Sequence, residues 1–276
     1  MDDIALIDAG DGRRLERFGP HVADRPAPSA TERPRMPRAW ASADLVWDAG
    51  RWTRGDGTSP WCVTTHGLTL ELRPAAGGQL GLFPDHASMW PWIRQATEAA
   101  VRAAAAAADP PAVLSLFAYT GGATLAAARA GAAVAHLDAS KTAVAWARSN
   151  ASASGLADAP IRWLVEDAGA FVRREIRRGR RYAGFIVDPP AYGHGPSGTD
   201  WRIERDLGPL LDGIRELRAD ETAFVLLTAH TPSHHGPRLG DLLARTFSVA
   251  PESGDLAIVA ESGARLRLGA YARWRP

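Results

Sequence analysis

The chain has 276 residues, with 32 Lys and Arg against 31 Asp and Glu, a formal net charge of +1 and a single cysteine. This length allows one large domain or a catalytic domain with a smaller one, and the single cysteine excludes an intrachain disulfide or a thiolate metal cluster. No apolar run approaches the ~18 residues of a membrane span, the first residues lack a basic secretory start, and the charge balance gives no whole-protein case for nucleic-acid binding. We therefore expect a soluble, cytoplasmic protein.

Residues 1–86 are predicted to form a small antiparallel β module, a possible substrate-recognition domain. Ile4–Asp8 and Arg14–Phe18 flank a glycine-rich turn, as in a hairpin, and a proline-rich loop follows. Further short strands are predicted at Leu45–Trp47, Trp52–Thr53, Trp61–Thr65 and Leu68–Leu72. The module's tryptophans are Trp40, Trp47, Trp52 and Trp61. Tryptophans can stack on bases, but in so small a module they more often form the core, and we favour the core.

Residues 87–276 are predicted to form a second domain of the α/β class. A helix is expected from Met89 to Ala108, and a regular alternation of strands and helices follows it, which is typical of a parallel sheet. The expected strands are Ala112–Phe117, a strand ending at Asp138, Ile161–Val165, Phe185–Val187 and Thr222–Thr228. The intervening helices begin near Gly122, Ser140, Ala168, Trp201 and Leu239. The chain closes with a predicted hairpin, so its last strand should run antiparallel to the others in a Rossmann-like sheet.

The central stretch of this domain is a strand, a glycine turn and a helix. The buried strand Ala112–Phe117 leads into Tyr119-Thr120-Gly121-Gly122, and a helical alanine-rich segment begins there. Ligands of parallel sheets bind beyond the carboxyl ends of the strands, and glycines let the backbone approach such a ligand. An ordinary tight turn is the alternative interpretation of the Gly-Gly pair.

Three later strands bring carboxylates to the same edge of the predicted sheet. The first ends at Asp138, where a carboxylate can accept both hydroxyls of a ribose. The second is followed by Asp167, which can accept an exocyclic adenine amine. For both residues the alternative is a helix N-cap. Together with the glycine turn, these acids favour a nucleotide-like cofactor.

The third strand ends in Asp188-Pro189-Pro190-Ala191-Tyr192, the most specific of these segments. Prolines lack an N–H and stiffen the loop, so backbone carbonyls are presented as acceptors. A stiff acceptor rim beside an aromatic ring fits a planar substrate that bears an amine, with Tyr192 as the stacking partner.

These motifs resemble the class I S-adenosylmethionine-dependent methyltransferases, and within them the large-subunit ribosomal RNA methyltransferases that modify cytosine or guanine. The match covers roughly Gly81 to Pro276, and Gly81-Leu82-Phe83-Pro84-Asp85-His86 resembles the family's segment leading into the cofactor site. The resemblance implies that the Tyr119–Gly122 turn holds the amino-acid part of the cofactor, that Asp138 holds its ribose and Asp167 its adenine, and that Asp188 faces the substrate. The implied cofactor-binding residues are Phe117, Tyr119, Thr120, Gly121, Gly122, Asp138, Ala139, Ser140, Asp167, Ala168 and Asp85. The implied catalytic residues are Asp188, Pro189 and Tyr192.

The sequence departs from that family where carbon-5 methylation of cytosine needs a cysteine nucleophile. Near the end of the fifth strand the chain has Leu227-Thr228-Ala229-His230-Thr231-Pro232, and Cys62 lies in the β module. We therefore expect direct transfer to a nitrogen or oxygen, with Asp188 orienting the acceptor or taking up its proton. We also expect the β module to take the place of the family's usual N-terminal RNA-binding domain.

Two clusters have weaker functional interpretations. His230, His234 and His235 share a loop but lack further ligands at metal spacing, so we expect a solvated loop with at most one substrate contact and no metal site. The second cluster is a basic run on a predicted helix and its exit. It comprises Arg173, Arg174, Arg177, Arg178, Arg180 and Arg181. Such a run is usually a solvated face, but it can also grip the phosphates of an RNA partner.

Four functions remain open from the sequence. The leading one is methyl transfer from S-adenosylmethionine to a base of ribosomal RNA, and the second is the same chemistry on a small molecule. A non-catalytic nucleotide-binding or RNA-binding protein of the same fold is the third, although the intact rim from Asp188 to Tyr192 argues against it. A dehydrogenase is the weakest, since the turn lacks the three-glycine pattern. The acceptor atom and the oligomeric state are not predicted.

Overall fold

The computed structural model describes residues 3–55, 57–104, 110–194, 200–219 and 223–276. The chain forms two compact units. The first comprises Met1–Ser88 and Leu256–Leu268, and the second comprises Met89–Asp255 and Gly269–Pro276. The division differs from the sequence-based one at the C-terminal hairpin, whose tip groups with the first unit although it is some 170 residues away in sequence.

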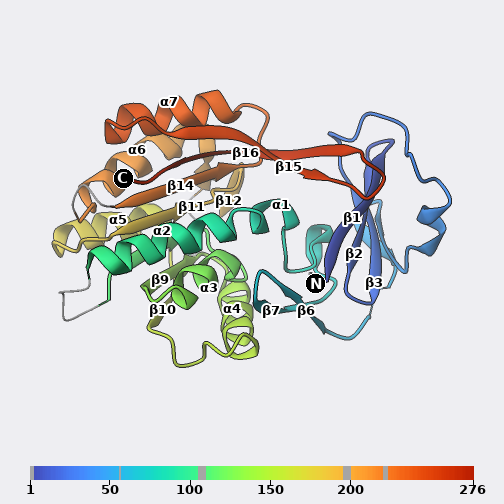
Figure 1. Ribbon diagram of the computed structural model, residues 1–276, viewed down its shortest axis with the longest axis horizontal. Helices are drawn as coiled ribbons and strands as arrows, with labels where there is room; N and C mark the ends of the chain where they lie inside the picture. Colours follow the sequence, from blue (N-terminus) through green and yellow to red (C-terminus); the bar gives the residue numbers. More distant parts are fainter. Residues whose placement is uncertain (1–2, 56, 105–109, 195–199, 220–222) are drawn as a thin grey trace. The chain divides into compact units, whose positions relative to one another are not determined.

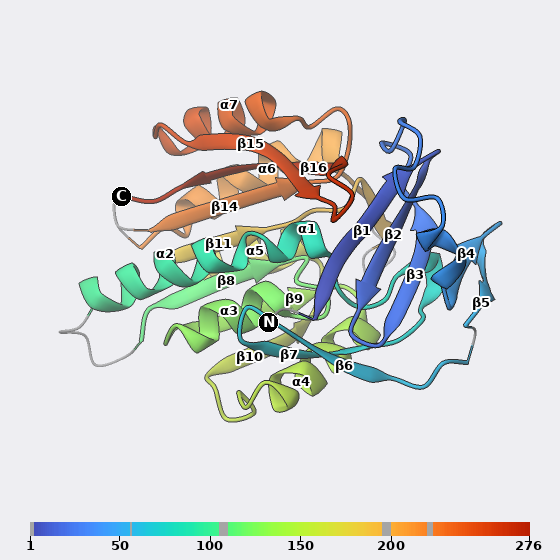
Figure 2. The same ribbon diagram turned by 45° about the vertical axis from the view of Figure 1, so that its right-hand side comes forward.

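The first unit is built on a five-stranded sheet in which neighbouring strands follow chain order (Figure 2). All its pairs are antiparallel except the pair of β3 and β4, which is parallel. Its strands are β1 (Ile4–Gly10), β2 (Arg13–Phe18), β3 (His21–Pro26), β4 (Leu45–Asp48) and β5 (Arg51–Arg54). A separate antiparallel hairpin joins β6 (Trp61–Thr65) to β7 (Leu68–Leu72), and the short helices are η1 (Ala39–Ser42), η2 (Ala76–Gly78) and α1 (Pro84–Ala87). The predicted antiparallel β module is thus confirmed, with one parallel pair within it.

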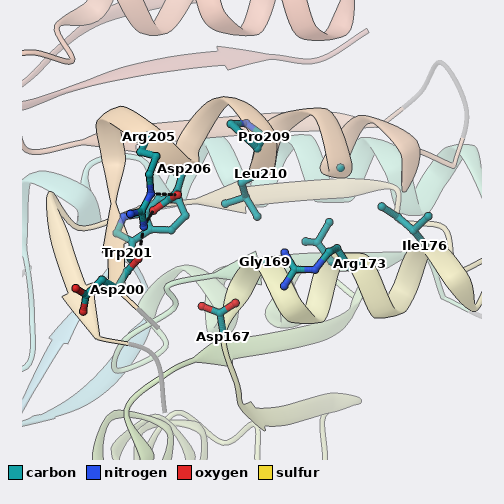
Figure 3. Close-up of a pocket in the computed structure, with 12 residues that line it drawn as sticks. Asp167, Gly169, Arg173, Ile176, Asp200, Trp201, Arg205, Asp206, Pro209 and Leu210 are labelled. Carbon is teal, nitrogen blue, oxygen red and sulfur yellow. Dashed lines mark hydrogen bonds and ion pairs between the residues drawn. The ribbon is translucent and has the colours of Figure 1, made fainter. Parts of the chain in front are cut away.

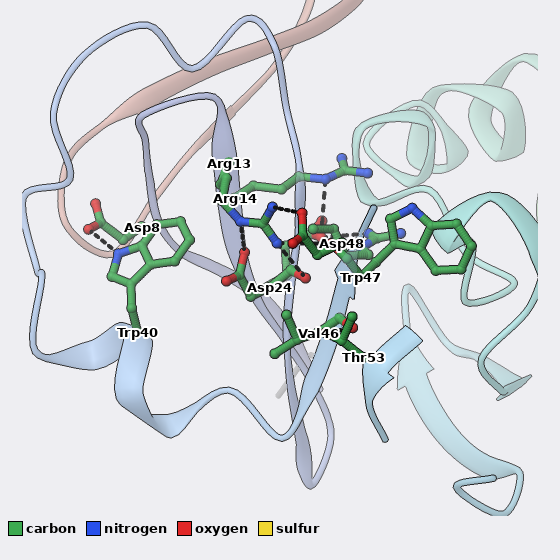
Figure 4. Close-up of polar contacts among 11 residues, drawn as sticks. Asp8, Arg13, Arg14, Asp24, Trp40, Val46, Trp47, Asp48 and Thr53 are labelled. Carbon is green, nitrogen blue, oxygen red and sulfur yellow. Dashed lines mark hydrogen bonds and ion pairs between the residues drawn. The ribbon is translucent and has the colours of Figure 1, made fainter. Parts of the chain in front are cut away.

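The tryptophans of the first unit are bonded into it. The indole N–H of Trp40 donates to the Asp8 carboxylate at 3.0 Å (Figure 4), and that of Trp61 donates to the Phe18 carbonyl at 3.0 Å. Trp52 is buried, and its ring packs edge-on against Trp47 at 5.3 Å between centroids. Trp52 is therefore a core residue, and the other three tryptophans are partly buried and held by contacts within the unit.

A buried ion pair lies in the same unit. Arg25 is 2% exposed, and its guanidinium donates to the Glu16 carboxylate at 2.5 Å and to the Gly78 carbonyl at 3.0 Å. Burial lowers the pKa of Arg25, and the adjacent Glu16 opposes that change. Substitution of either residue should be strongly destabilising, because removal of one partner leaves the other charge buried and unpaired.

The second unit contains a seven-stranded, mostly parallel sheet in the order β10-β9-β8-β11-β14-β16-β15 (Figure 1). Its strands are β8 (Ala112–Leu116), β9 (Ala133–Asp138), β10 (Ile161–Val165), β11 (Gly184–Val187), β14 (Phe224–Ala229), β15 (Glu252–Val259) and β16 (Arg265–Trp274). Its helices are α2 (Trp90–Ala103), α3 (Gly122–Arg129), α4 (Lys141–Ala153), α5 (Ala168–Arg177), α6 (Ile203–Glu216) and α7 (Gly236–Phe247). The last strand, β16, pairs antiparallel with β14. The predicted α/β class and the antiparallel closing strand are confirmed.

Helices cover both faces of this sheet. The two views show α2, α3 and α4 on one face and α5, α6 and α7 on the other. Alternate residues of the strands, such as Leu114 and Leu116, pack with Phe171 and Leu211 in one continuous core. Strands buried on both faces must be apolar throughout, which is why the sequence identified them so readily.

Some predicted elements have different bounds. Helix α2 ends at Ala103, and the predicted extension to Ala108 lies largely outside the described residues, as does the start of the strand predicted from Thr222. The helix predicted from Trp201 begins at Ile203, because Trp201 belongs to a two-stranded hairpin of β12 (Tyr192–His194) and β13 (Asp200–Arg202). This pair of strands directly follows the Asp-Pro-Pro segment and sets the direction in which the chain leaves that segment.

Candidate active site

The turn between β8 and α3 has an unusual backbone. Phe117 and Tyr119 have positive φ values of 56° and 48°, and Gly121 has a φ of 89°. A left-handed conformation costs roughly 1–2 kcal/mol for a residue with a side chain, and such strain gathers at functional sites. Gly121 is the N-cap of α3, and no side chain caps this helix. The turn therefore presents backbone groups to whatever lies beyond the strand end.

Asp138 at the end of β9 is joined to this turn. One carboxylate oxygen accepts the backbone N–H of Tyr119 at 2.8 Å, and the other accepts the N–H of Ser140 at 2.8 Å. Burial raises the pKa of Asp138, and these two hydrogen bonds act in the opposite direction. The sequence left open that Asp138 caps the following helix. In the structure the N-cap of α4 is Ser140, whose side chain accepts the Ala143 N–H. Each carboxylate oxygen retains acceptor capacity for a ligand hydroxyl.

Asp167 caps α5. Its Oδ1 accepts the backbone N–H of Ala170 at 2.8 Å, which is the capping role that the sequence left open. The first helical residue, Ala168, is buried. Asp167 also lines a cavity of about 460 Å³, so capping does not withdraw the residue from a ligand.

That cavity lies between α5 and α6 (Figure 3). Its wall includes Arg173 and Trp201, and on α6 the adjacent Arg205 and Asp206 form an ion pair at 2.7 Å. Of the residues predicted to bind the cofactor, it contains Asp167 alone. The cavity therefore borders the predicted cofactor site at one end and does not coincide with it.

Asp188 follows β11 at the carboxyl edge of the sheet. The Thr228 hydroxyl donates to Oδ1 of Asp188 at 2.5 Å, and Nε2 of His230 lies 3.4 Å from the same oxygen. Both partners come from the end of β14, which pairs in parallel with β11. The His230 side chain is 34% exposed in a loop that is largely solvent-accessible, as expected, and it also lies against Asp188.

The other two loop histidines have structural roles. His234 is 2% exposed and interacts with Ser233 at 3.0 Å, and burial lowers its pKa. The side chain of His235 accepts the Arg238 N–H and caps α7. Within the described ranges, no group of three His, Cys, Asp or Glu residues could hold a metal ion.

The Asp-Pro-Pro segment is fixed by Trp201, a residue that the sequence analysis did not single out. The indole N–H of Trp201 donates to the Pro190 carbonyl at 2.8 Å, and its ring lies 4.8 Å from that of Phe117. Trp201 thus connects the rim to the turn after β8. Tyr192 is 47% exposed, and the Arg202 guanidinium lies 5.8 Å from its ring centroid.

The basic run on α5 does not act as one patch. Arg174 pairs with Glu166 and Arg178 pairs with Glu175 at 3.5 Å. Arg173 lines the cavity between α5 and α6. A second cavity of about 240 Å³ contains Arg162, Arg180 and Arg181.

Asp85, the remaining predicted cofactor ligand, lies in the first unit. It is in α1 and is 2% exposed, and its charge acts on the buried Arg25. Cys62 is on β6 in the same unit and is exposed. The cofactor role of Asp85 stays a prediction.

The partial relatives among known proteins include two ribosomal RNA methyltransferases. No family model matches the chain. A stretch of 107 residues is 33% identical to the ribosomal RNA large subunit methyltransferase K/L of Shewanella frigidimarina, covering 38% of this chain and 15% of that protein. A stretch of 110 residues is 32% identical to the ribosomal RNA large subunit methyltransferase K of Neisseria meningitidis, covering 39% of this chain and 31% of that protein. The chain thus spans less than a third of the length of either relative.

A solved structure matches along almost the whole length of both chains. The SAM-dependent methyltransferase from Agrobacterium tumefaciens is 35% identical, with a TM-score of 0.90 over 100% of this chain and 91% of that one. The chain belongs to the S-adenosylmethionine-dependent methyltransferases. A Streptococcus mutans protein described as a SAM-dependent methyltransferase has the same fold at 15% identity, with a TM-score of 0.73 over 99% of this chain and 74% of that one.

The edge of the sheet in this methyltransferase suits S-adenosylmethionine, the cofactor of the family. Asp138 offers a half-buried carboxylate for a diol, and the uncapped N-terminus of α3 favours a negatively charged group such as an amino-acid carboxylate. Among the described residues, no helix is both long and apolar enough to cross a membrane. Sequence reasoning missed Thr228 and considered His230 only as part of a solvated loop. Thr228 lies in β14 and His230 directly follows this strand, and only the strand order places them beside Asp188.

Proposed function

We propose that this methyltransferase acts on a base of ribosomal RNA and transfers the methyl group directly to a nitrogen or oxygen. The observation that carries the proposal is the set of side chains at the ends of β11 and β14. They are a carboxylate, a hydroxyl and an imidazole, from Asp188, Thr228 and His230, and this group contains no thiol. The names of the two partial relatives support ribosomal RNA as the substrate.

Cofactor binding is assigned to the turn after β8 and to the strand ends beside it. The Tyr119–Gly122 turn and the N-terminus of α3 hold the amino-acid part, with Phe117 beneath the turn. Asp138, flanked by Ala139 and Ser140, holds the ribose. Asp167, with Ala168, holds the adenine. When bound, S-adenosylmethionine supplies an electrophilic methyl group on a positively charged sulfur.

The protein's own contribution is to position the acceptor and to handle its proton. Asp188 accepts a hydrogen bond from the acceptor and takes its proton, and the Pro189 carbonyl helps to orient it. Tyr192 stacks on the substrate base, because its ring is exposed and next to Arg202. A cysteine adduct is not part of this chemistry.

RNA binding is assigned to arginines that are not committed to ion pairs with acidic neighbours. Arg174 and Arg178 contact glutamates, so they are poorer candidates than the sequence suggested. Arg173, Arg180 and Arg181 are better placed to contact phosphates, whereas Arg162 in the second cavity lies 3.8 Å from the Glu175 carboxylate. The first unit is proposed to contribute to substrate recognition, and a cytoplasmic location follows from a ribosomal substrate.

Methyl transfer from labelled S-adenosylmethionine to total cellular RNA tests the proposal. Asp188→Ala should lower turnover by about 10²–10⁴-fold while cofactor affinity measured by calorimetry stays unchanged. Asp212→Ala, which removes an exposed aspartate of α6, is the matched control and should behave as wild type. An Asp188→Ala variant that retains activity would contradict the role of Asp188.

The acceptor is tested separately from the chemistry. Label in RNA that depends on Asp188 allows the modified base to be mapped. Cofactor binding without labelled mature RNA would exclude that substrate, and precursor RNA, ribosomal particles and small molecules would be the next acceptors to assay.

A further inference from the structure

The environment of Asp188 assigns its protonation state. Two side chains approach a single oxygen, Oδ1, from the same neighbouring strand end. The Thr228 hydroxyl is fully buried, and its contact with Asp188 at 2.5 Å is much shorter than its contact with the Val187 carbonyl at 3.4 Å. The hydroxyl proton therefore points at the carboxylate.

The His230 ring is fixed by the neighbouring antiparallel strand. Gly269 of β16 has no Cβ, and a Cβ built there would lie 2.9 Å from Nδ1 of His230 and 2.6 Å from the Ala229 carbonyl oxygen. The ring thus occupies the space that a side chain at position 269 would fill. Its Nε2 is the nitrogen that faces Asp188, and an unprotonated Nε2 would set two lone pairs against each other.

We propose that His230 is a positioning residue for methyl transfer, which acts with Thr228 to hold Asp188 as an ionised hydrogen-bond acceptor. The hydrogen bond from Thr228 and the imidazole Nε2 3.4 Å away favour the charged carboxylate and its observed rotamer, because donors interact more strongly with an ionised acceptor than with a neutral one. Among the contacts described for His230, the charged partner is Asp188. The neighbouring residues from β14 and β16 are Thr228 and Gly269, which are uncharged.

This arrangement narrows the substrate class, and the inference rests on the proposed function. A carboxylate that only accepts hydrogen bonds selects an acceptor atom that carries hydrogen, which is an exocyclic amine, a ring N–H or a hydroxyl. The acceptor gains a bond to the methyl carbon, the sulfur keeps the electron pair of the broken carbon–sulfur bond, and the acceptor's proton passes to Asp188 and then to solvent. Carbon atoms and ring nitrogens without hydrogen are excluded.

Variants of His230 test the positioning role. His230→Leu removes the donor and should lower kcat about tenfold to hundredfold with the cofactor dissociation constant unchanged. His230→Gln keeps an N–H donor and should retain kcat within about threefold. His235→Asn changes a neighbouring histidine of the same loop, keeps a residue suited to capping α7, and is the control. Equal kcat values for wild type and His230→Leu would overturn the proposal.

Nuclear magnetic resonance tests the pair without substrate or cofactor. The ring resonances of His230 should shift in Asp188→Asn, because the carboxylate 3.4 Å from Nε2 is replaced by an amide, while those of His235 should stay as in wild type. His230 resonances that are identical in wild type and Asp188→Asn would overturn the pairing. A shift of the His230 resonances without label in any RNA would support the pair and reject the proposed substrate. A methyl group mapped to carbon or to a ring nitrogen lacking hydrogen would overturn the substrate class.

Discussion

At the scale of single residues, Asp138 has both a structural role and a proposed role in cofactor binding. Its carboxylate accepts the N–H of Tyr119, a residue in a strained left-handed conformation, at 2.8 Å. The group assigned to the ribose therefore also holds the turn assigned to the rest of the cofactor. A change at this position should affect both.

Asp138→Ala should weaken cofactor binding by about 2 kcal/mol, or some thirtyfold, because charge-assisted hydrogen bonds to ligand hydroxyls are lost. Isothermal calorimetry with S-adenosylmethionine measures this, with Asp212→Ala as a control. Since burial raises the pKa of Asp138, affinity should also fall as the pH drops through that raised pKa, and this pH dependence should vanish in the variant. Unchanged affinity would remove Asp138 from the site.

His136 should make the stability of the protein depend on pH. The residue is fully buried and Nδ1 lies 2.9 Å from the Thr124 hydroxyl, and burial lowers its pKa to about 3. Unfolding therefore takes up a proton at any pH between about 3 and the ordinary value of about 6.5. The stabilising contribution is present above pH 6.5 and is lost as the pH falls toward 3, by up to about 1.4 kcal/mol per pH unit.

Urea unfolding between pH 4 and 7 measures this slope. His136→Asn should flatten it, since asparagine does not titrate, whereas the exposed His235→Asn should leave it as in wild type. Identical slopes in wild type and His136→Asn would show that the proton uptake occurs elsewhere.

The sequence predicted the acidic residues of the site better than their partners. Asp138, Asp167 and Asp188 follow apolar strands, and parallel strands must end at a common edge. The partners of Asp188 could not be predicted in this way, because Thr228 and His230 meet Asp188 only through the adjacency of β11 and β14. The order of strands along the chain predicts where each strand ends but not which strand ends lie side by side.

At the scale of elements, Gly122 controls the packing of α2 on α3. A Cβ at this position would lie 2.1 Å from Cζ2 of Trp90, whose side chain is 4% exposed in α2. The glycine is therefore required by helix packing as well as by the turn. From the sequence, only the role of this glycine in the turn was expected.

Gly122→Ala should lower the free energy of unfolding by about 1–3 kcal/mol, because the buried indole has to move. Gly208→Ala in α6 is the matched control, since a Cβ there meets no atom within 4 Å, and it should stabilise the protein by about 0.5–1 kcal/mol. Chemical denaturation of both variants checks the prediction. An unchanged free energy of unfolding in Gly122→Ala would show that α2 shifts to accept the extra methyl group without loss of stability.

Elements with strong apolar patterns were predicted well, and short or polar ones were not. Strand β3 contains Val22 and Ala23 as its internal apolar residues and runs into a proline-rich loop, so nothing in its pattern indicates a strand. Strands β12 and β13 have three residues each, too few for a periodicity to appear. Their pairing depends on the Asp-Pro-Pro segment and on Trp201, which are tertiary features.

At the scale of the whole molecule, the C-terminal hairpin belongs to both units. Strand β15 leaves the second unit at Asp255 and β16 returns to it at Gly269. Between them the chain adds Leu266 to a cluster with Leu6 and Ala27, and the Glu261 N–H donates to the Leu6 carbonyl at 2.9 Å. The first unit is therefore completed by residues near the end of the chain.

Leu266→Ala should destabilise the protein by about 2–5 kcal/mol and reduce amide-exchange protection in β1, because a fully buried side chain is truncated in that cluster. Val259→Ala on the same hairpin is the control, since Val259 is 67% exposed and its truncation should cost less than about 0.5 kcal/mol. Unchanged exchange in β1 of the Leu266→Ala variant would show that the hairpin does not stabilise the first unit.

The shared hairpin also sets an order of events during synthesis on the ribosome. The ~180 residues between Ser88 and Leu268 must be translated before the first unit has all its strands. At about 5–20 residues per second, the nascent N-terminal segment waits roughly 10–40 s with the apolar side of β1 uncovered. Domains usually fold in the order of their synthesis, but here the first unit receives its last segment only just before the second unit receives Gly269–Pro276.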